Sequence, residues 1–215
     1  VAITVFGDLD ISTLSELPLG RSPITTHLVN ALTKPTYLER AWQRIREEVA
    51  EGHQAYVVAP RISASTPEDS DMDFLFGTES KDMYAVCELA PELAMGALKG
   101  LKVAELHGKQ AAELKDATMQ AFSNQEIDVL VTTTVIEVGV DVPNATVMVI
   151  MDADRFGISQ LHQLRGRIGR GDAPGLCLLI TKVPEDSLAY DRLTAVANTL
   201  DGFELARIDL EQRRE

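Results

Sequence analysis

The sequence predicts an α/β fold in which helices cover both faces of a parallel sheet. Short apolar segments alternate with amphipathic segments along most of the chain. Several apolar segments are continuous β-branched runs, which are typical of strands buried on both faces of a parallel sheet. Alternation of strands and helices implies right-handed crossovers and a doubly wound sheet.

Six segments are predicted to be strands, and in chain order they are Ile24–Val29, Gln54–Ala59, Val103–Leu106, Asp128–Val131, Thr146–Ile150 and Leu176–Ile180. The predicted helices between them are Tyr37–Ala50, Lys81–Leu98 and Lys109–Phe122. The first helix has one apolar face, which consists of Leu38, Ala41, Trp42, Ile45 and Val49. The segment Ser63–Gly77 is polar and acidic, so we expect a surface loop without chemistry.

The pattern changes after the last predicted strand. Ser187 is a suitable N-cap for a helix that extends to Thr199. The pair Asp201-Gly202 predicts a turn, and Phe203–Arg213 then has the pattern of a second helix. The tail is therefore predicted to be a helical hairpin.

Composition and charge limit the possible functions. The chain has 215 residues and a net charge of −13, which argues against a general polyanion-binding surface. Residues 157–171 contain no acidic side chain, however, and a local basic site there is compatible with nucleic-acid binding. No apolar run is long enough for a membrane span. Cys87 and Cys177 are far apart and the four histidines are scattered, so we predict no structural metal.

The segment Gln163–Arg170 is the strongest candidate for chemistry. It places Arg165, Arg167 and Arg170 between glycines. The guanidinium group stays charged and its fork of donors suits phosphate oxygens. We expect the glycines to keep bulk away from a polyanion, and they are Gly166, Gly169 and Gly171. If the stretch is helical, Arg167 and Arg170 share one face, as a pair of arginine fingers on a triphosphate would.

These residues support a resemblance to a known family. Gln163–Arg170 resembles motif six of superfamily 2 helicases, and Thr132–Pro143 resembles motif five. Phe6–Ser12 and Glu16–Arg21 resemble the segment after the third motif, and Asp201–Ala206 with Asp209–Arg213 resembles a translocation hairpin. Within the superfamily the sequence is most similar to bacterial helicases of branched DNA. Two alternatives stay open, a transcription-repair coupling translocase and a helicase-like docking module without catalysis.

The resemblance implies a RecA-like second helicase lobe. Residues 1–23 would then be a lead-in segment from a missing first lobe, residues 24–183 the lobe itself, and residues 184–215 the start of the translocation hairpin. Both ends of the chain look cut, so we expect a piece of a larger protein. Gly108-Lys109 is not a phosphate loop, because Val103 stands where its first glycine should be. An acid box is also missing from the sequence, so we expect the fragment alone to be inactive and to bind no cofactor.

Residue roles follow from the resemblance. Arg167 and Arg170 are the expected catalytic residues, and the expected nucleotide contacts are Gly139, Asp141, Gln163, Arg167 and Arg170. At strand ends, where α/β sheets place ligands, the expected DNA contacts are Arg61, His107 and Thr133. Arg192 and Arg213 match basic positions of the translocation motif, so we expect them to couple ATP hydrolysis to movement.

The full-length protein is then expected to be an ATP-dependent helicase that remodels stalled forks and Holliday junctions in DNA repair and recombination. ATP and Mg²⁺ would be held mainly by the missing first lobe. Its expected partners are branched duplex DNA and the single-stranded DNA-binding protein. We expect a monomer in the bacterial cytoplasm, associated with the nucleoid.

Overall fold

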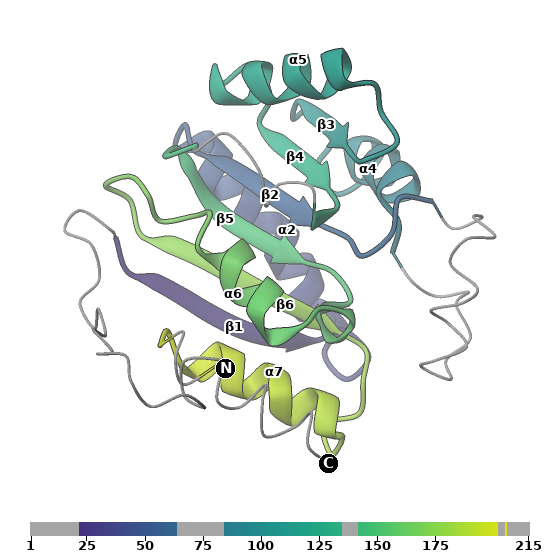
Figure 1. Ribbon diagram of the computed structural model, residues 1–215, viewed down its shortest axis with the longest axis vertical. Helices are drawn as coiled ribbons and strands as arrows, with labels where there is room; N and C mark the ends of the chain where they lie inside the picture. Colours follow the sequence, from purple (N-terminus) through teal and green to yellow (C-terminus); the bar gives the residue numbers. More distant parts are fainter. Residues whose placement is uncertain (1–21, 64–83, 135–141, 202–204, 206–215) are drawn as a thin grey trace, which may run out of the picture.

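A six-stranded parallel sheet forms the centre of the computed structural model, which describes residues 22–63, 84–134, 142–201 and 205 (Figure 1). The strands are β1 (Ile24–Asn30), β2 (Gln54–Val58), β3 (Val103–Leu106), β4 (Val129–Thr132), β5 (Ala145–Ile150) and β6 (Gly175–Thr181). Their order is β1-β6-β5-β2-β4-β3, and every pairing is parallel. The predicted fold class and all six predicted strands are confirmed.

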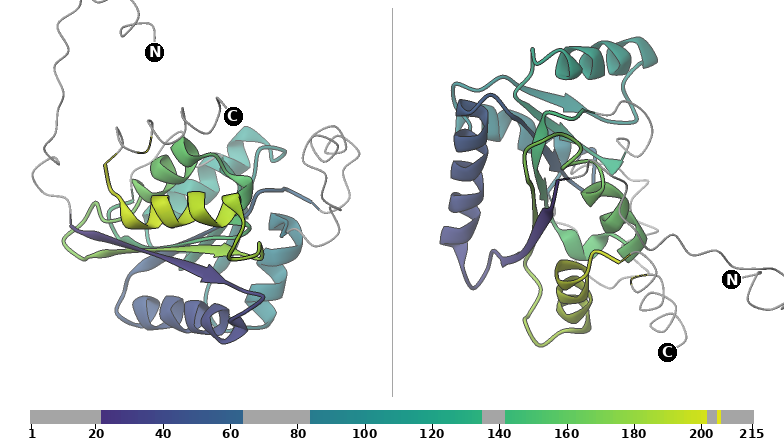
Figure 2. Two further views of the ribbon diagram at one scale, coloured as in Figure 1. Left: turned by 90° about the horizontal axis from the view of Figure 1, so that it is seen from below. Right: turned by 90° about the vertical axis from the view of Figure 1, so that its left-hand side faces the viewer.

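Helices cover both faces of this sheet (Figure 2). They are α2 (Pro35–Ala50), α4 (Val86–Met95), α5 (Ala112–Ser123), α6 (Ile158–Arg165) and α7 (Leu188–Asn198), with a 3-10 turn η4 (Ala153–Arg155) before α6. The predicted helices are confirmed with shifted ends, whereas α6 was not predicted as an element. The predicted second helix of the hairpin and nearly all of the 63–77 loop lie outside the described residues.

Alternating side chains of the strands supply two separate cores. On one face Val57 and Val149 pack with α2 and α4, through residues such as Ile45 and Leu89. On the other face Tyr56, Met148 and Cys177 belong to the core of α5, α6 and α7, which also contains Phe122, Leu161, Leu164, Leu193 and Val196. Because strand side chains point alternately to the two faces, buried runs such as β2 serve both cores.

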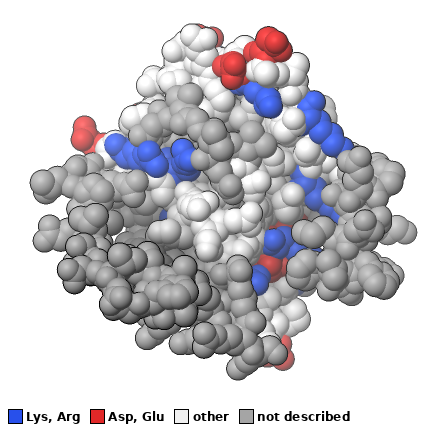
Figure 3. Space-filling model, viewed as in Figure 1, with Lys and Arg blue, Asp and Glu red and all other residues white. Residues whose placement is uncertain are grey.

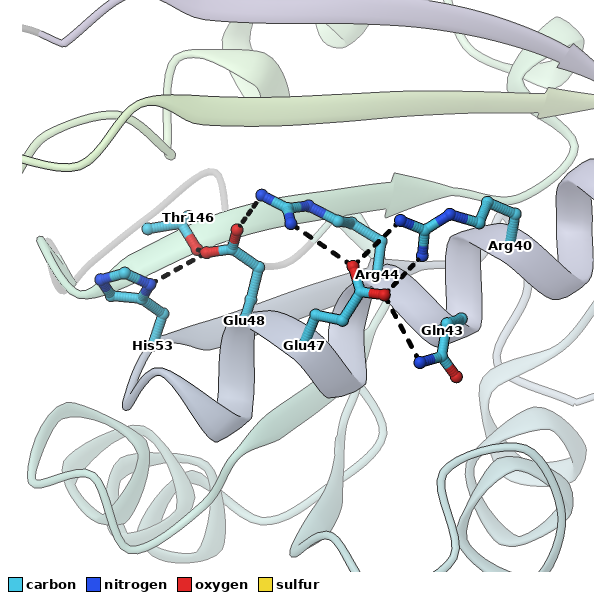
Figure 4. Close-up of polar contacts among 7 residues, drawn as sticks. All are labelled: Arg40, Gln43, Arg44, Glu47, Glu48, His53 and Thr146. Carbon is cyan, nitrogen blue, oxygen red and sulfur yellow. Dashed lines mark hydrogen bonds and ion pairs between the residues drawn. The ribbon is translucent and has the colours of Figure 1, made fainter.

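The carboxyl end of α2 is fixed to the sheet by a buried carboxylate (Figure 4). Glu48 is 5% exposed, and its Oε2 accepts a 2.6 Å hydrogen bond from the Thr146 hydroxyl of β5. Nδ1 of His53 lies 2.9 Å from the same oxygen, and Arg44 pairs with Oε1. Since an unpaired buried charge is costly, this full set of partners keeps α2 in place over the sheet.

The start of α7 follows the prediction. The hydroxyl of Ser187 accepts a hydrogen bond from the Tyr190 amide at 3.2 Å, so Ser187 is the N-cap. Gly157 precedes α6, and its amide donates to Oε1 of Gln160 at 3.1 Å. Both helices therefore begin at defined residues on the carboxyl side of the sheet. Among the described helices none is long and apolar enough to cross a membrane.

Candidate nucleotide and nucleic-acid interface

Three predicted DNA contacts meet at the carboxyl edge of the sheet. Arg61, Thr133 and His107 follow β2, β4 and β3, which are neighbours in the sheet. The Thr133 amide donates to the Leu106 carbonyl at 3.4 Å, and the Arg61 carbonyl accepts from the Val86 amide at 2.9 Å. The structure thus brings these residues together, although their contact with DNA stays a prediction.

Exposure differs among these residues. Thr133 and His107 are only 7% and 8% exposed, whereas Arg61 is partly exposed. A ligand at this edge would therefore meet Arg61 and backbone amides more readily than the two buried side chains. Figure 3 shows several Lys and Arg side chains along the right-hand side of this view, where the strands end.

Arg167 and Arg170 lie at the opposite, amino edge of the sheet. Helix α6 starts after the carboxyl end of β5 and ends at Arg165, and the loop that follows leads to Gly175 at the start of β6. The condition under which both arginines would share one helical face is not met, because α6 ends at Arg165. Nε of Arg170 instead donates to the Gly166 carbonyl at 2.9 Å, which fixes the side chain to the loop. A group of basic side chains is visible at this edge as well (Figure 3).

The glycines of this loop are explained by the chain's own packing. Gly169 has φ +67, and an added Cβ would lie 2.8 Å from Ile24 Cγ1. At Gly171 an added Cβ would lie 2.6 Å from the Pro143 carbonyl oxygen. A Cβ at Gly166 would make only ordinary contacts. The prediction that the glycines clear space for a polyanion is therefore corrected at Gly169 and Gly171, where the Ile24 side chain and the Pro143 backbone already occupy the space.

The same contacts join the two motifs. Gly171 lies against Pro143, the last residue of the motif-five segment, and the Ser22 hydroxyl donates to the Gly171 carbonyl at 2.8 Å. Gly139 and Asp141, the nucleotide contacts predicted in that segment, lie outside the described residues. Gln163 is exposed on α6. Residues 166–174, which we call the arginine loop, thus lie against the end of motif five at the amino edge of the sheet.

Arg165 has a different role from the one its motif indicates. It is 2% exposed, and its Nη1 donates to the carbonyls of Val196 at 2.7 Å and Thr199 at 2.8 Å. Nη2 lies 3.0 Å from Nδ1 of His162. Burial lowers the pKa of Arg165 from its ordinary value. Its guanidinium therefore holds the end of α7 to α6 and is not available to a phosphate.

Arg192 connects α7 to the segment before α6. Its Nη2 donates to the Asp154 carbonyl in η4 at 2.5 Å, and the Asp154 carboxylate accepts from the Thr181 hydroxyl at 2.5 Å. Arg192 of α7 therefore contacts a backbone carbonyl of the 3-10 turn η4. Arg213 lies outside the described residues. Together Arg165 and Arg192 connect α7 to both ends of the η4–α6 segment.

Sequence reasoning missed Asp152, which follows β5 in the middle of the carboxyl edge. It has a left-handed backbone with φ +46 and is 6% exposed. Its Oδ2 accepts a 2.8 Å hydrogen bond from the Tyr84 amide, and Nζ of Lys182 lies 4.4 Å from the Tyr84 ring centre. Burial raises the pKa of the Asp152 carboxyl. A carboxylate two residues after a buried strand was the available signal.

A doubly wound parallel sheet with an arginine loop at one edge and strand-end polar residues at the other defines a RecA-like second lobe of a helicase. Residues 39–172 match the family model described as "Helicase conserved C-terminal domain". The chain belongs to this family.

Relatives and a solved structure agree with this assignment. The chain is 58% identical over its whole length to "ATP-dependent DNA helicase RecG" of Mycobacterium tuberculosis, and 44% identical over 99% of its length to the Staphylococcus aureus protein of the same name. It spans 28% of the length of each. The structure titled "Structure of RecG bound to three-way DNA junction" superposes with a TM-score of 0.70, at 36% identity over 97% of this chain and 25% of that one.

Proposed function

We propose that the chain is the second motor lobe of a RecG-type, ATP-dependent DNA helicase that acts on forks and Holliday junctions in repair and recombination. The observation that carries this proposal is the 58% identity to a RecG helicase across the whole chain. The relatives named above also favour this function over that of a coupling translocase. The intact arginine loop favours a motor lobe over a docking module.

The geometry supports separate binding sites for DNA and for the nucleotide at the two edges of the sheet. In the proposed function DNA lies along the carboxyl edge near Arg61, Thr133 and His107, and the nucleotide lies against the amino edge. Arg167 and Arg170 would stabilise charge on the γ-phosphate in the transition state, a role worth about 10³ to 10⁵ in rate. Gly139, Asp141 and Gln163 complete the proposed nucleotide contacts.

The arginine loop suits an anionic nucleotide, because Arg167 and Arg170 are partly exposed and the loop packs against Ile24 of β1 and against Pro143. Bound ATP and Mg²⁺ would supply the phosphoryl group and neutralise its charge, and both are proposed to sit mainly on the first lobe. This chain's own residues position the arginines. The isolated chain is accordingly proposed to lack ATPase activity.

Arg192 and Arg213 are proposed to couple ATP hydrolysis to movement along DNA. The Arg192 contact with the segment before α6 supports this role, because α6 leads directly to the arginine loop. We further propose that the full-length protein is a cytoplasmic monomer at the nucleoid, and that the single-stranded DNA-binding protein is a partner. These last points rest on the family resemblance.

The test uses the full-length protein. Arg170→Ala should lower the ATPase rate by at least about 10³-fold while ATP binding persists, because the finger acts mainly on transition-state charge. Arg192→Ala should retain hydrolysis but lose junction unwinding on the same preparation. Arg40→Ala is the matched control, since Arg40 is exposed on α2 and forms an ion pair with Glu47 on the same helix. Full turnover by Arg170→Ala would remove Arg170 from the mechanism.

A further inference from the structure

Three potential metal ligands converge between α4 and the end of β3. They are Cys87 in the first turn of α4, Glu105 in β3 and His107 directly after β3. One ligand atom from each residue lies within 4.8 Å of the other two. Sγ of Cys87 is 3.7 Å from Nε2 of His107, which is 4.0 Å from Oε1 of Glu105. The sequence predicted no metal because these residues show no ligand spacing, but the fold brings them together.

The His107 ring is poorly satisfied where it lies. The residue is 8% exposed, yet its Nδ1 is buried without a hydrogen-bond partner among the described residues. Nε2 has only the long contacts with the thiol and the carboxylate. Within the described part of the chain Nε2 therefore has no short polar partner, and a cation at Nε2 would give this atom one strong interaction. Nδ1 is a separate atom and would not contact that cation.

The spacing suits a tetrahedral ion. With Zn–S about 2.3 Å and Zn–N about 2.0 Å, the sulfur and nitrogen ligands of a tetrahedral centre are about 3.5 Å apart. The observed separation of Cys87 and His107 is 3.7 Å, so these ligands are close to the required positions. Oε1 of Glu105 is 4.0 Å from Nε2, and the three ligand atoms lie within 4.8 Å of one another, so the Glu105 side chain, which is 42% exposed, has to move toward the other two ligands.

A second cluster of similar composition does not carry the same argument. Glu48, Glu51 and His53 also lie within reach of one another. However, the Glu48 carboxylate already pairs with Thr146, His53 and Arg44. A cation there would have to displace these partners, and this cluster contains no sulfur. It therefore serves as an internal control.

We propose that Cys87, Glu105 and His107 bind Zn²⁺ or a similar divalent cation that prefers sulfur and nitrogen ligands, with a fourth position open. On binding, the Cys87 thiol loses its proton to solvent and the thiolate forms a bond to the metal. Burial and the charges of Glu105 and Glu88 raise the pKa of the free Cys87 thiol, while Lys109 lowers it. Metal binding at this site is accordingly weaker at lower pH.

Cobalt(II) titration of the 215-residue chain tests the proposal. One equivalent of Co²⁺ should produce the charge-transfer absorption of a cobalt–thiolate bond, and added Zn²⁺ should abolish it. Cys87→Ser should lose that absorption, and His107→Ala should weaken binding at least about tenfold. Glu105→Gln should weaken binding but keep the absorption. Cys177→Ala and His53→Ala are the matched controls and should bind as the unchanged chain does.

Alkylation by iodoacetamide gives a second measurement that does not depend on a variant's folding. Zn²⁺ should slow the modification of Cys87, whereas Cys177 is fully buried and should stay unmodified in the folded chain with or without metal. Absence of a cobalt–thiolate band at one equivalent, equal binding by Cys87→Ser, or unchanged alkylation of Cys87 would each overturn the proposal.

Discussion

Replacing Arg165 by methionine should loosen α7 without breaking the sheet. The substitution keeps most of the apolar stem but removes both hydrogen bonds that Nη1 donates to the carbonyls of Val196 and Thr199. These carbonyls belong to the end of α7, where no further helical turn supplies partners. Hydrogen bonds to a charged donor contribute about 1.5–3 kcal/mol each, and loss of the buried charge offsets part of the effect. The expected net destabilisation is about 2–4 kcal/mol.

Two measurements check this value. For a domain of this size, 1 kcal/mol shifts the melting temperature by about 2–4 °C, so Arg165→Met should lower it by about 5–15 °C. Hydrogen exchange followed by mass spectrometry should show faster exchange in α7 than in α2. The local effect is expected because Arg165 joins α6 to α7 and does not contact α2.

The control is Arg40→Met, which removes an exposed ion pair with Glu47 on α2. Exposed pairs contribute less than about 1 kcal/mol, so this variant should unfold almost as the unchanged chain does. Equal melting temperatures for Arg165→Met and Arg40→Met would refute the argument. So would an exchange pattern in which α7 is no faster than α2, since the carbonyl contacts would then not hold the helix.

The remaining predictions concern Gly171 and Asp152. Gly171→Ala should destabilise the folded chain and lower the full-length ATPase rate, because its Cβ would lie 2.6 Å from the Pro143 oxygen, whereas Gly166→Ala has room and should be tolerated in both assays. Burial raises the pKa of Asp152 above the usual 3.8, so the folded state prefers the protonated carboxyl and loses stability as pH rises through that raised pKa. The amide oxygen of Asp152→Asn can still accept from the Tyr84 amide. In urea unfolding this variant should therefore gain stability relative to the unchanged chain as the pH rises from about 3.5 to 7. If the difference in unfolding free energy between the two chains stays constant across that range, the raised pKa has no effect on stability.

Strand positions could be predicted because their signal is local. Runs such as Val129–Thr132 are apolar on both faces, and only a strand between two helical layers buries such a run completely. Helix α6 was missed because it has eight residues, and its apolar positions Ile158, Leu161 and Leu164 span too short a stretch to stand out.

The site was predictable only in part, for reasons that lie in tertiary packing. The sequence places Arg61, Thr133 and His107 at strand ends, and the parallel sheet then brings them to one edge. The sequence cannot show that the Arg165 side chain is buried against α7, since a buried arginine and an exposed arginine look the same in a sequence. The reason for Gly171 was hidden as well, because it depends on Pro143, a residue far away in the sequence.

The sheet order also determines how few residues connect the proposed DNA site to the proposed nucleotide site. Strand β2 lies between β4 and β5, so the chain leaves the carboxyl end of β4 and re-enters the sheet at the amino end of β5. Residues 133–144 alone make this transit, and β4 is four residues long, or about 13 Å. The connection therefore starts beside one proposed ligand and finishes beside the other. We therefore expect a substitution at either end of this connection to change both ATP hydrolysis and DNA affinity in the full-length protein.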